Sequence, residues 1–176
     1  METVKIIAFA TLSAIVYGIL HDLVTAHVCV EYFTIAHPPV FSTKSPFLLA
    51  IGWGIIATWW VGLPLGVLLA AAARLGKSNK LGLKDLRRLI IVLMLCSGVA
   101  AVVAGTVGGL FFVPFDAGIY WWYDAIPKAK HAAFTFAAWA HGTSYLFGLV
   151  GGLFLIGHTI WCRFRPARPV TLPAPG

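Results

Sequence analysis

Charged residues are scarce in this chain. Lysine, arginine, aspartate and glutamate make up 11% of its 176 residues, whereas 60% of the residues are hydrophobic. Soluble domains carry about 25% charged residues, so this composition excludes an ordinary water-soluble protein and indicates a lipid environment. At this length we predict a single domain.

Cysteine is also rare, and its spacing excludes several kinds of site. Cys29, Cys96 and Cys162 are expected outside the membrane, within a span and at the inner edge, so no two should lie at disulfide distance. The sequence also has no CxxC redox or metal motif. The sequence has no His-Glu-x-x-His signature of zinc hydrolases and no paired Glu-x-x-His motifs of the di-iron type. It also lacks a nucleophile–base pattern, a phosphate-binding glycine loop and a dinucleotide fingerprint.

Four apolar stretches are long enough to cross a membrane, whose hydrocarbon core requires about 20 helical residues. We therefore predict an all-α integral membrane protein, a four-transmembrane-helix antiparallel bundle. The first helix is expected to continue outside the membrane to residue 36, since Pro38 and Pro39 end it. The predicted spans are residues 5–23, 47–71, 89–115 and 133–160.

Positive charges gather on one side of the predicted membrane. Ten of the 13 lysines and arginines precede the first span, lie between the second and third, or follow the fourth. By the positive-inside rule, this places the N and C termini in the cytoplasm of a bacterial-type cytoplasmic membrane. Because the cations sort by membrane side, the lipid bilayer is the predicted partner and no nucleic acid is expected. The ten are Lys5, Arg74, Lys77, Lys80, Lys84, Arg87, Arg88, Arg163, Arg165 and Arg168.

The two ends of the chain carry separate signals. Residues 163–176 are basic and contain four prolines, which predicts a disordered cytoplasmic tail. Residues 1–26 have an alternative interpretation as a cleaved secretory signal, because Lys5 precedes an apolar run and Val24-Thr25-Ala26 suits a signal peptidase. We expect the segment to be retained as the first membrane helix.

Residue types that bind metals concentrate at the outer side of the predicted bundle. Counting 1.5 Å per residue from the cytoplasmic edge puts His21 and His141 at the same depth and Glu31 level with His131. Imidazoles and carboxylates at such depth are costly and usually functional. Together they suit a transition metal ion such as zinc, copper or iron.

We therefore predict a membrane metalloprotein with a metal site at its outer face. The protein would be either a metal-dependent enzyme or a protein that handles metal ions. The sequence does not choose between these roles. The predicted metal ligands are His27, Glu31, His131 and His141, with His21 and Asp22 completing the set or orienting it.

Three alternatives remain open at this point. One is electron transfer through a b-type haem held by His21 and His141. Another is a small transporter lined by the polar residues. A third is a membrane-complex assembly subunit or homo-oligomer that docks through small-residue stripes on the third and fourth spans, which are also expected to pack against each other. The stripes are Gly98, Ala101, Gly105 and Gly109 on one span and Gly148 and Gly152 on the other.

Overall fold

The structure is a computed structural model that describes residues 1–77, 79–113 and 121–164. Within these ranges it is helical, with short connections and no strand. Four helical segments are long and apolar enough to cross a membrane, in agreement with the predicted all-α membrane class. Their helices are α1 (Glu2–Val28), α3 (Pro46–Arg74), α4 (Leu83–Val107, continued by the π-helix Gly108–Phe112) and α6 (His131–Phe164).

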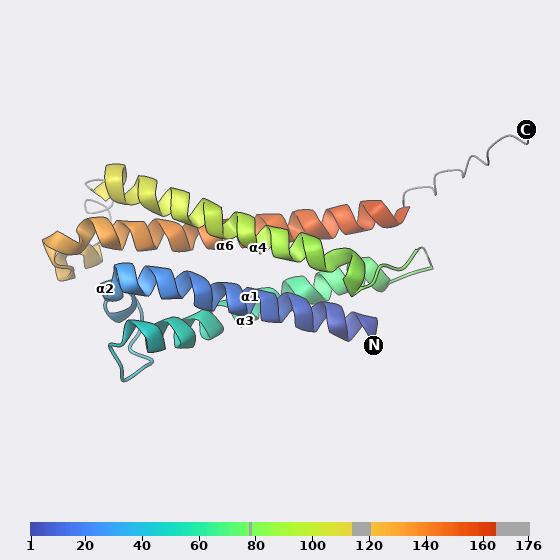
Figure 1. Cartoon of the computed structure of the whole chain (residues 1–176), viewed down its shortest axis with the longest axis horizontal. Helices are drawn as coiled ribbons and strands as arrows, with labels where there is room; N and C mark the ends of the chain where they lie inside the picture. The colour runs from blue at the N-terminus through green and yellow to red at the C-terminus, as the bar shows by residue number, and fades with distance from the viewer. Residues whose placement is uncertain (78, 114–120, 165–176) are drawn as a thin grey trace, which may run out of the picture.

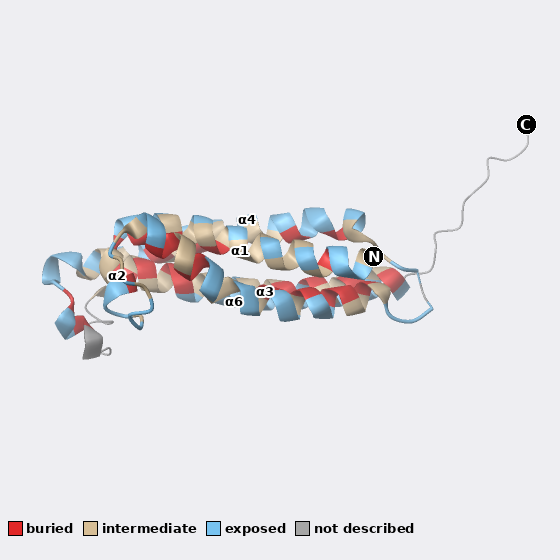
Figure 2. Cartoon of the chain, turned by 90° about the horizontal axis from the view of Figure 1, so that it is seen from below, coloured by how far each residue is buried: buried red, intermediate tan, exposed pale blue. Residues whose placement is uncertain are grey.

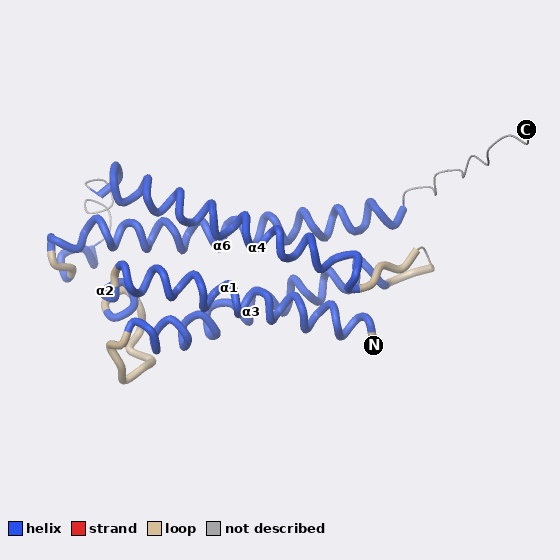
Figure 3. The backbone as a smooth tube through the Cα atoms, in the orientation of Figure 1, coloured by secondary structure: helices blue, strands red, loops and turns tan. Residues whose placement is uncertain are grey.

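The long helices form two tightly packed pairs. Helix α1 packs mainly against α3, and α4 packs mainly against α6, while contacts between the pairs are fewer. Figure 1 shows the start of α1, the start of α4 and the end of α6 at one end of the molecule, opposite the short helix α2 (Val30–Thr34). Figure 3 shows the α1–α3 connection at the α2 end and the α3–α4 connection at the other. The two pairs enclose the interior where the polar residues meet.

The outward surface of the bundle is strongly apolar. Figure 2 shows exposed residues along the outer faces of the long helices and buried residues between them. Many of the exposed side chains are large, as in Leu95, Val99 and Phe154, which are 65%, 66% and 74% exposed. Water would penalise an apolar surface of this extent, whereas lipid tails solvate it. The exposed faces of the helices therefore match a bilayer.

Close contact between α1 and α3 depends on glycine. A Cβ atom placed on Gly54 would lie 2.6 Å from the backbone nitrogen and Cα of Ile19, so any side chain there would separate the helices. The carbonyl oxygen of Gly54 also accepts a hydrogen bond of 2.6 Å from the Thr58 hydroxyl. Small residues at such crossings let two backbones approach, which is how apolar helices gain packing energy in lipid.

The predicted small-residue stripe of the third span is used inside the chain. Cβ atoms on Gly105 and Gly109 would each lie 2.9 Å from a backbone carbonyl oxygen of α6. The stripe of the fourth span does not complete this contact as expected. Gly152 faces Leu65 of α3, and no atom lies within 4 Å of a Cβ placed on Gly148. The glycine of α6 that meets α4 is instead Gly151, where an added Cβ would clash with the Leu93 side chain.

The first helix is shorter than the continuous helix to residue 36 that the sequence predicts. It ends at Val28, because Cys29 adopts an extended backbone with φ −150° and ψ 93° before α2 begins. The break turns α2 back onto the bundle. Phe33 is thereby buried to 3% exposure in a cluster with Trp53 of α3. Burying the large Phe33 side chain stabilises the folded chain more than extending α1 by one turn into water would.

At the opposite end, Arg163 joins α6 to α3. Its guanidinium donates hydrogen bonds to the carbonyl oxygens of Ala72, Leu75 and Asn79, which lie in or just beyond the last turn of α3. A cation at the C-terminus of a helix satisfies carbonyls that lack intrahelical partners. Arg163 and Phe164 thus belong to α6. The rest of the predicted tail, residues 165–176, lies outside the described residues.

The α1–α3 crossing yields a stability prediction. We expect Gly54→Ala to lower the free energy of unfolding by about 1–3 kcal/mol, the usual cost of an overpacked contact. Thermal unfolding in detergent measures this loss. Gly157→Ala is the matched control, because a Cβ on Gly157 meets no atom within 4 Å. Equal midpoints for the two variants would contradict the role of Gly54.

Candidate metal centre

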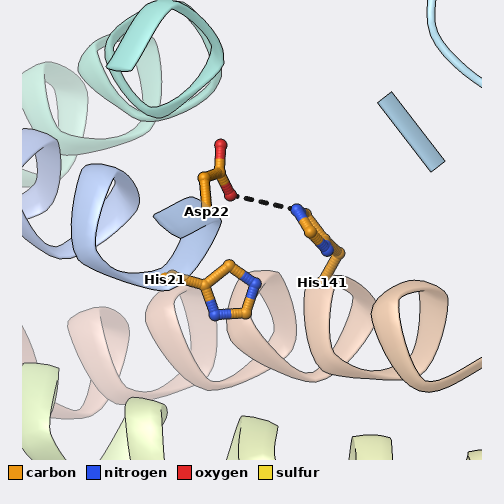
Figure 4. A group of neighbouring side chains, drawn as sticks. All are labelled: His21, Asp22 and His141. Carbon is orange, nitrogen blue, oxygen red and sulfur yellow. Dashed lines mark hydrogen bonds and ion pairs between the residues drawn. The ribbon is translucent and has the colours of Figure 1, made fainter. Parts of the chain in front are cut away.

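Three metal-ligand side chains converge from the two ends of the chain. His21 and Asp22 are consecutive residues of α1, and His141 lies on α6. One potential ligand atom from each of the three lies within 4.8 Å of the other two. Figure 4 shows the three side chains directed toward one another. Asp22 and His141 are 4% and 8% exposed, so the group is inside the protein.

The orientation of His141 is set by its own helix. Its Nδ1 donates a hydrogen bond of 2.8 Å to the carbonyl oxygen of Ala137, and a carbonyl only accepts. Nδ1 therefore carries a proton, and Nε2 is the nitrogen that faces Oδ1 of Asp22 at 3.1 Å. Two arrangements satisfy this pair: a proton shared between Nε2 and the carboxylate, or a cation bound by both. Backbone bonding at Nδ1 is the usual way in which metal-binding imidazoles are oriented.

His21 completes the group with a nitrogen that lacks a partner. Its Nδ1 lies 3.3 Å from the Ser144 hydroxyl, which in turn lies 2.7 Å from the Tyr17 hydroxyl. Its Nε2 is buried and has no hydrogen-bond partner among the described residues. In Figure 4 one nitrogen of this ring points toward His141. A buried polar atom without a partner costs about 1–3 kcal/mol, a cost that a bound ion would remove.

Aromatic side chains of α2 cover the group on the side of that helix. The ring of Tyr32 lies 4.5 Å from that of His141 between centroids, and the ring of Phe33 lies 5.6 Å from it. Burial raises the pKa of the Tyr32 hydroxyl, so this group stays protonated and available as a donor. The aromatic cover reduces the local dielectric constant, which strengthens charge interactions at the centre.

His37 adds a third imidazole near the group formed by His21, Asp22 and His141. Its Nδ1 donates a hydrogen bond of 2.9 Å to the carbonyl oxygen of Tyr32, and its ring stacks on Phe33 and contacts Trp53 edge to face. Burial lowers the pKa of His37, and nearby His141 lowers it further, while the Tyr32 carbonyl and Asp22 act in the opposite direction. The net effect favours neutral imidazole.

The group opens onto an internal cavity of about 140 Å³ between the helix pairs. All four long helices contribute to its wall. His21, Asp22 and His141 line one part of it, together with Tyr17 and Ser144. The remaining wall is mostly apolar and continues toward the end of the bundle where α1 begins.

The other three predicted ligands lie elsewhere. His27 is exposed, and its Nδ1 donates a hydrogen bond of 2.7 Å to the carbonyl oxygen of Leu23. Glu31 lies 3.9 Å from the Lys130 amine. His131 donates from Nε2 to the carbonyl oxygen of Ile126. The break at Cys29 turns Glu31 away from the direction of α1, and His27 is exposed on α1 before the break. The expected alignment of His27 and Glu31 with His131 and His141 therefore does not form a shared group.

Glu31 interacts with the buried thiol of Cys29. The Sγ atom donates to Oε2 of Glu31 at 3.4 Å. Burial raises the pKa of the Cys29 thiol to about 11, and Glu31 contributes in the same direction. The thiol therefore stays protonated at neutral pH. A protonated thiol is a poor metal ligand, which separates Cys29 from the candidate centre.

Tyr17, Ser144 and Tyr32 were not predicted as parts of the centre. Two of them had a local signal, because Tyr17 precedes His21 by four residues and Ser144 follows His141 by three. Residues at these spacings share a helix face, so Tyr17 and Ser144 each lie one helical turn from the histidine of their own helix. Tyr32 had no such signal, because its position depends on the break at Cys29.

No family model, curated protein or solved structure matches this chain. The functional argument therefore depends on the geometry of the group formed by His21, Asp22 and His141.

The burial of His37 yields a pH prediction. Because the pKa of His37 is lowered in the folded state, the unfolded chain binds the proton more tightly than the folded chain. His37 therefore stabilises the fold above about pH 6.5, and this stabilisation is lost as the pH falls. Nuclear magnetic resonance of ring-labelled histidine should give His37 a pKa below 6.5, the signal being assigned by its loss in His37→Gln. Acidification should also destabilise the native protein more than this variant. A His37 pKa above 6.5 would contradict the assignment.

Proposed function

We propose that the chain is a multi-pass membrane metalloprotein that holds one transition metal ion with His21, Asp22 and His141. One observation carries the proposal: two imidazoles and a carboxylate converge inside an apolar bundle, and one imidazole nitrogen has no partner in the described part of the chain. Polar groups buried at such cost are usually functional. Of the predicted ligand set, the proposal keeps His21, Asp22 and His141.

The donor set indicates the type of metal site. Two neutral imidazoles and one carboxylate suit zinc, iron or copper, and three protein ligands leave at least one coordination position open. All three residues line the same cavity, so a further ligand would approach the ion from that cavity. Structural metal sites are closed by four protein ligands, whereas catalytic sites keep an open position. This supports a metal-dependent reaction over metal storage or handover.

The proposed membrane arrangement is an antiparallel four-helix bundle with both termini in the cytoplasm of a bacterial cell. Two features support it. The start of α1, the start of α4 and the end of α6 lie at one end of the molecule, and these are the positions of the predicted cytoplasmic cations. The proposed centre would then lie in the outer half of the membrane.

A haem held by His21 and His141 is less well supported than a single ion. Their rings contact each other edge to face, with centroids 4.5 Å apart and planes 77° apart. Axial ligands of one haem lie on opposite faces of a macrocycle, and no macrocycle fits between rings in contact. The transporter alternative is also less well supported, because the cavity wall beyond the centre is apolar at Leu65, Leu69 and Leu155.

Metal analysis of purified, tag-free protein tests the proposal. Native protein should carry close to one metal ion per chain. His141→Ala and Asp22→Asn should each weaken metal affinity by at least the roughly 10–100-fold that accompanies loss of an outer-shell partner, because each removes a direct ligand.

Matched controls separate this site from adventitious binding to histidine. His27→Ala, His131→Ala and His158→Ala should keep the metal, since none of these residues belongs to the group within 4.8 Å. Equal losses in all variants would show adventitious binding. Loss in His27→Ala and His131→Ala alone would instead support the ligand set first predicted from the sequence.

A separate experiment tests the membrane arrangement. In a variant whose natural cysteines are replaced by serine, we introduce Ser42→Cys or Asn79→Cys in the two connections that flank α3. Because Asn79 lies among the cations, a membrane-impermeant maleimide should label Ser42→Cys in intact cells and Asn79→Cys only after permeabilisation. The reverse pattern would invert the proposed orientation.

A further inference from the structure

The internal cavity is elongated along the bundle. On α6 its lining extends from His141 to Leu155, a separation of 14 residues or about 21 Å at 1.5 Å per residue. This length exceeds the roughly 15 Å depth of one leaflet of the hydrocarbon core. Polar side chains are found near His141, while Leu69, Ile90 and Leu155 line the far part. The cavity therefore has one polar end and one long apolar part.

A second unpartnered donor faces this space. Ser97 of α4 is 1% exposed and lines the cavity, and its hydroxyl has no hydrogen-bond partner among the described residues. It lies next to the polar end, because a Cβ placed on neighbouring Gly98 would contact the Tyr17 ring at 3.6 Å. Buried hydroxyls normally have a partner. An oxygen atom of a bound molecule would provide one for Ser97.

The charges of the wall restrict the polar group of that molecule. Among the described residues, the cavity lining contains no lysine or arginine, and Asp22 is its only acidic residue. A phosphate or carboxylate group would therefore be balanced only by the proposed metal ion, whose charge Asp22 already partly neutralises. A neutral carbonyl or hydroxyl group needs only hydrogen-bond donors and acceptors, which Tyr17, Ser97 and Ser144 supply.

We propose that the cavity binds a long-chain neutral lipid whose carbonyl or hydroxyl head lies beside His21, Asp22 and His141. The apolar chain extends between the helix pairs toward Leu155. The inference builds on the proposed function, since the head would reach the open coordination position. The apolar part of the cavity does not depend on the metal, so lipid and metal binding can be tested separately.

Photoaffinity labelling of the full-length protein tests this proposal. The probe is a hexadecanol analogue with a diazirine in the middle of its chain, applied to protein in detergent micelles. Cross-links mapped by mass spectrometry should concentrate on cavity residues such as Leu65, Leu93 and Leu155. Cross-links confined to the exposed residues Val103 and Phe154, which do not line the cavity, would overturn the proposal.

A cavity-filling variant and its control sharpen the test. Gly148 lines the cavity, and no described atom lies within 4 Å of a Cβ placed there. Gly148→Phe therefore adds a ring to the cavity lining at a position with room for its first side-chain atom. Labelling of cavity residues should fall roughly ten-fold, equivalent to about 1.4 kcal/mol of binding free energy. Gly157→Phe on the same helix points into equally open space outside the cavity and should label like the native protein. Equal labelling of Gly148→Phe and Gly157→Phe would overturn the proposal. A third variant, Gly148→Leu, repeats the comparison with a smaller side chain.

Competition and metal content distinguish the remaining outcomes. Excess hexadecanol should suppress cavity labelling more than excess hexadecanoate, and equal suppression would overturn the neutral head group. Gly148→Phe should keep its metal while losing the probe. If the purified protein contains no metal but its cavity is labelled, the metal site is refuted and the lipid proposal stands. If the protein contains metal but its cavity is not labelled, the lipid proposal is refuted and the metal site stands.

Discussion

The burial of the Asp22 carboxylate is the constraint on which the rest of the structure depends. A carboxylate inside an apolar bundle is unfavourable unless a cation or a donor compensates it. His141 provides the contact, and its orientation is fixed by the carbonyl oxygen of Ala137. This pairing ties α1 to α6 at a defined depth. Nε2 of His141 faces this carboxylate, and Nε2 of His21 has no partner among the described residues. The proposed metal site rests on this arrangement.

The packing of the helices explains why space remains beside this group. Glycine brings α1 close to α3 and α4 close to α6, so each pair buries its own small residues. Fewer contacts join the pairs, and the cavity lies between them with the polar group at one end. The break at Cys29 then folds aromatic residues of α2 over that end. A centre shielded from water with an apolar channel beside it is suited to a lipid-soluble molecule.

Much of the architecture could be predicted because it follows from hydropathy. Each of the four apolar stretches predicted from the sequence corresponds to a long helix. Counting helical rise also placed His21 and His141 at one depth, and their rings are in contact. The rest of the site could not be obtained this way. The extended backbone at Cys29 redirects Glu31, and no residue pattern marks that break. His27 precedes the break and is exposed on α1. The role of Asp22 depends on which side of α1 faces α6, which hydropathy does not specify.

X-ray absorption spectroscopy of the metal-loaded protein tests the central claim most directly. With His21, Asp22 and His141 as ligands, the first shell should contain only nitrogen and oxygen, at about 2.0–2.2 Å if the ion is zinc. Multiple scattering from two imidazoles should be present in the native protein and reduced to one imidazole in His141→Ala. A sulfur ligand, or a native spectrum without imidazole scattering, would contradict the account.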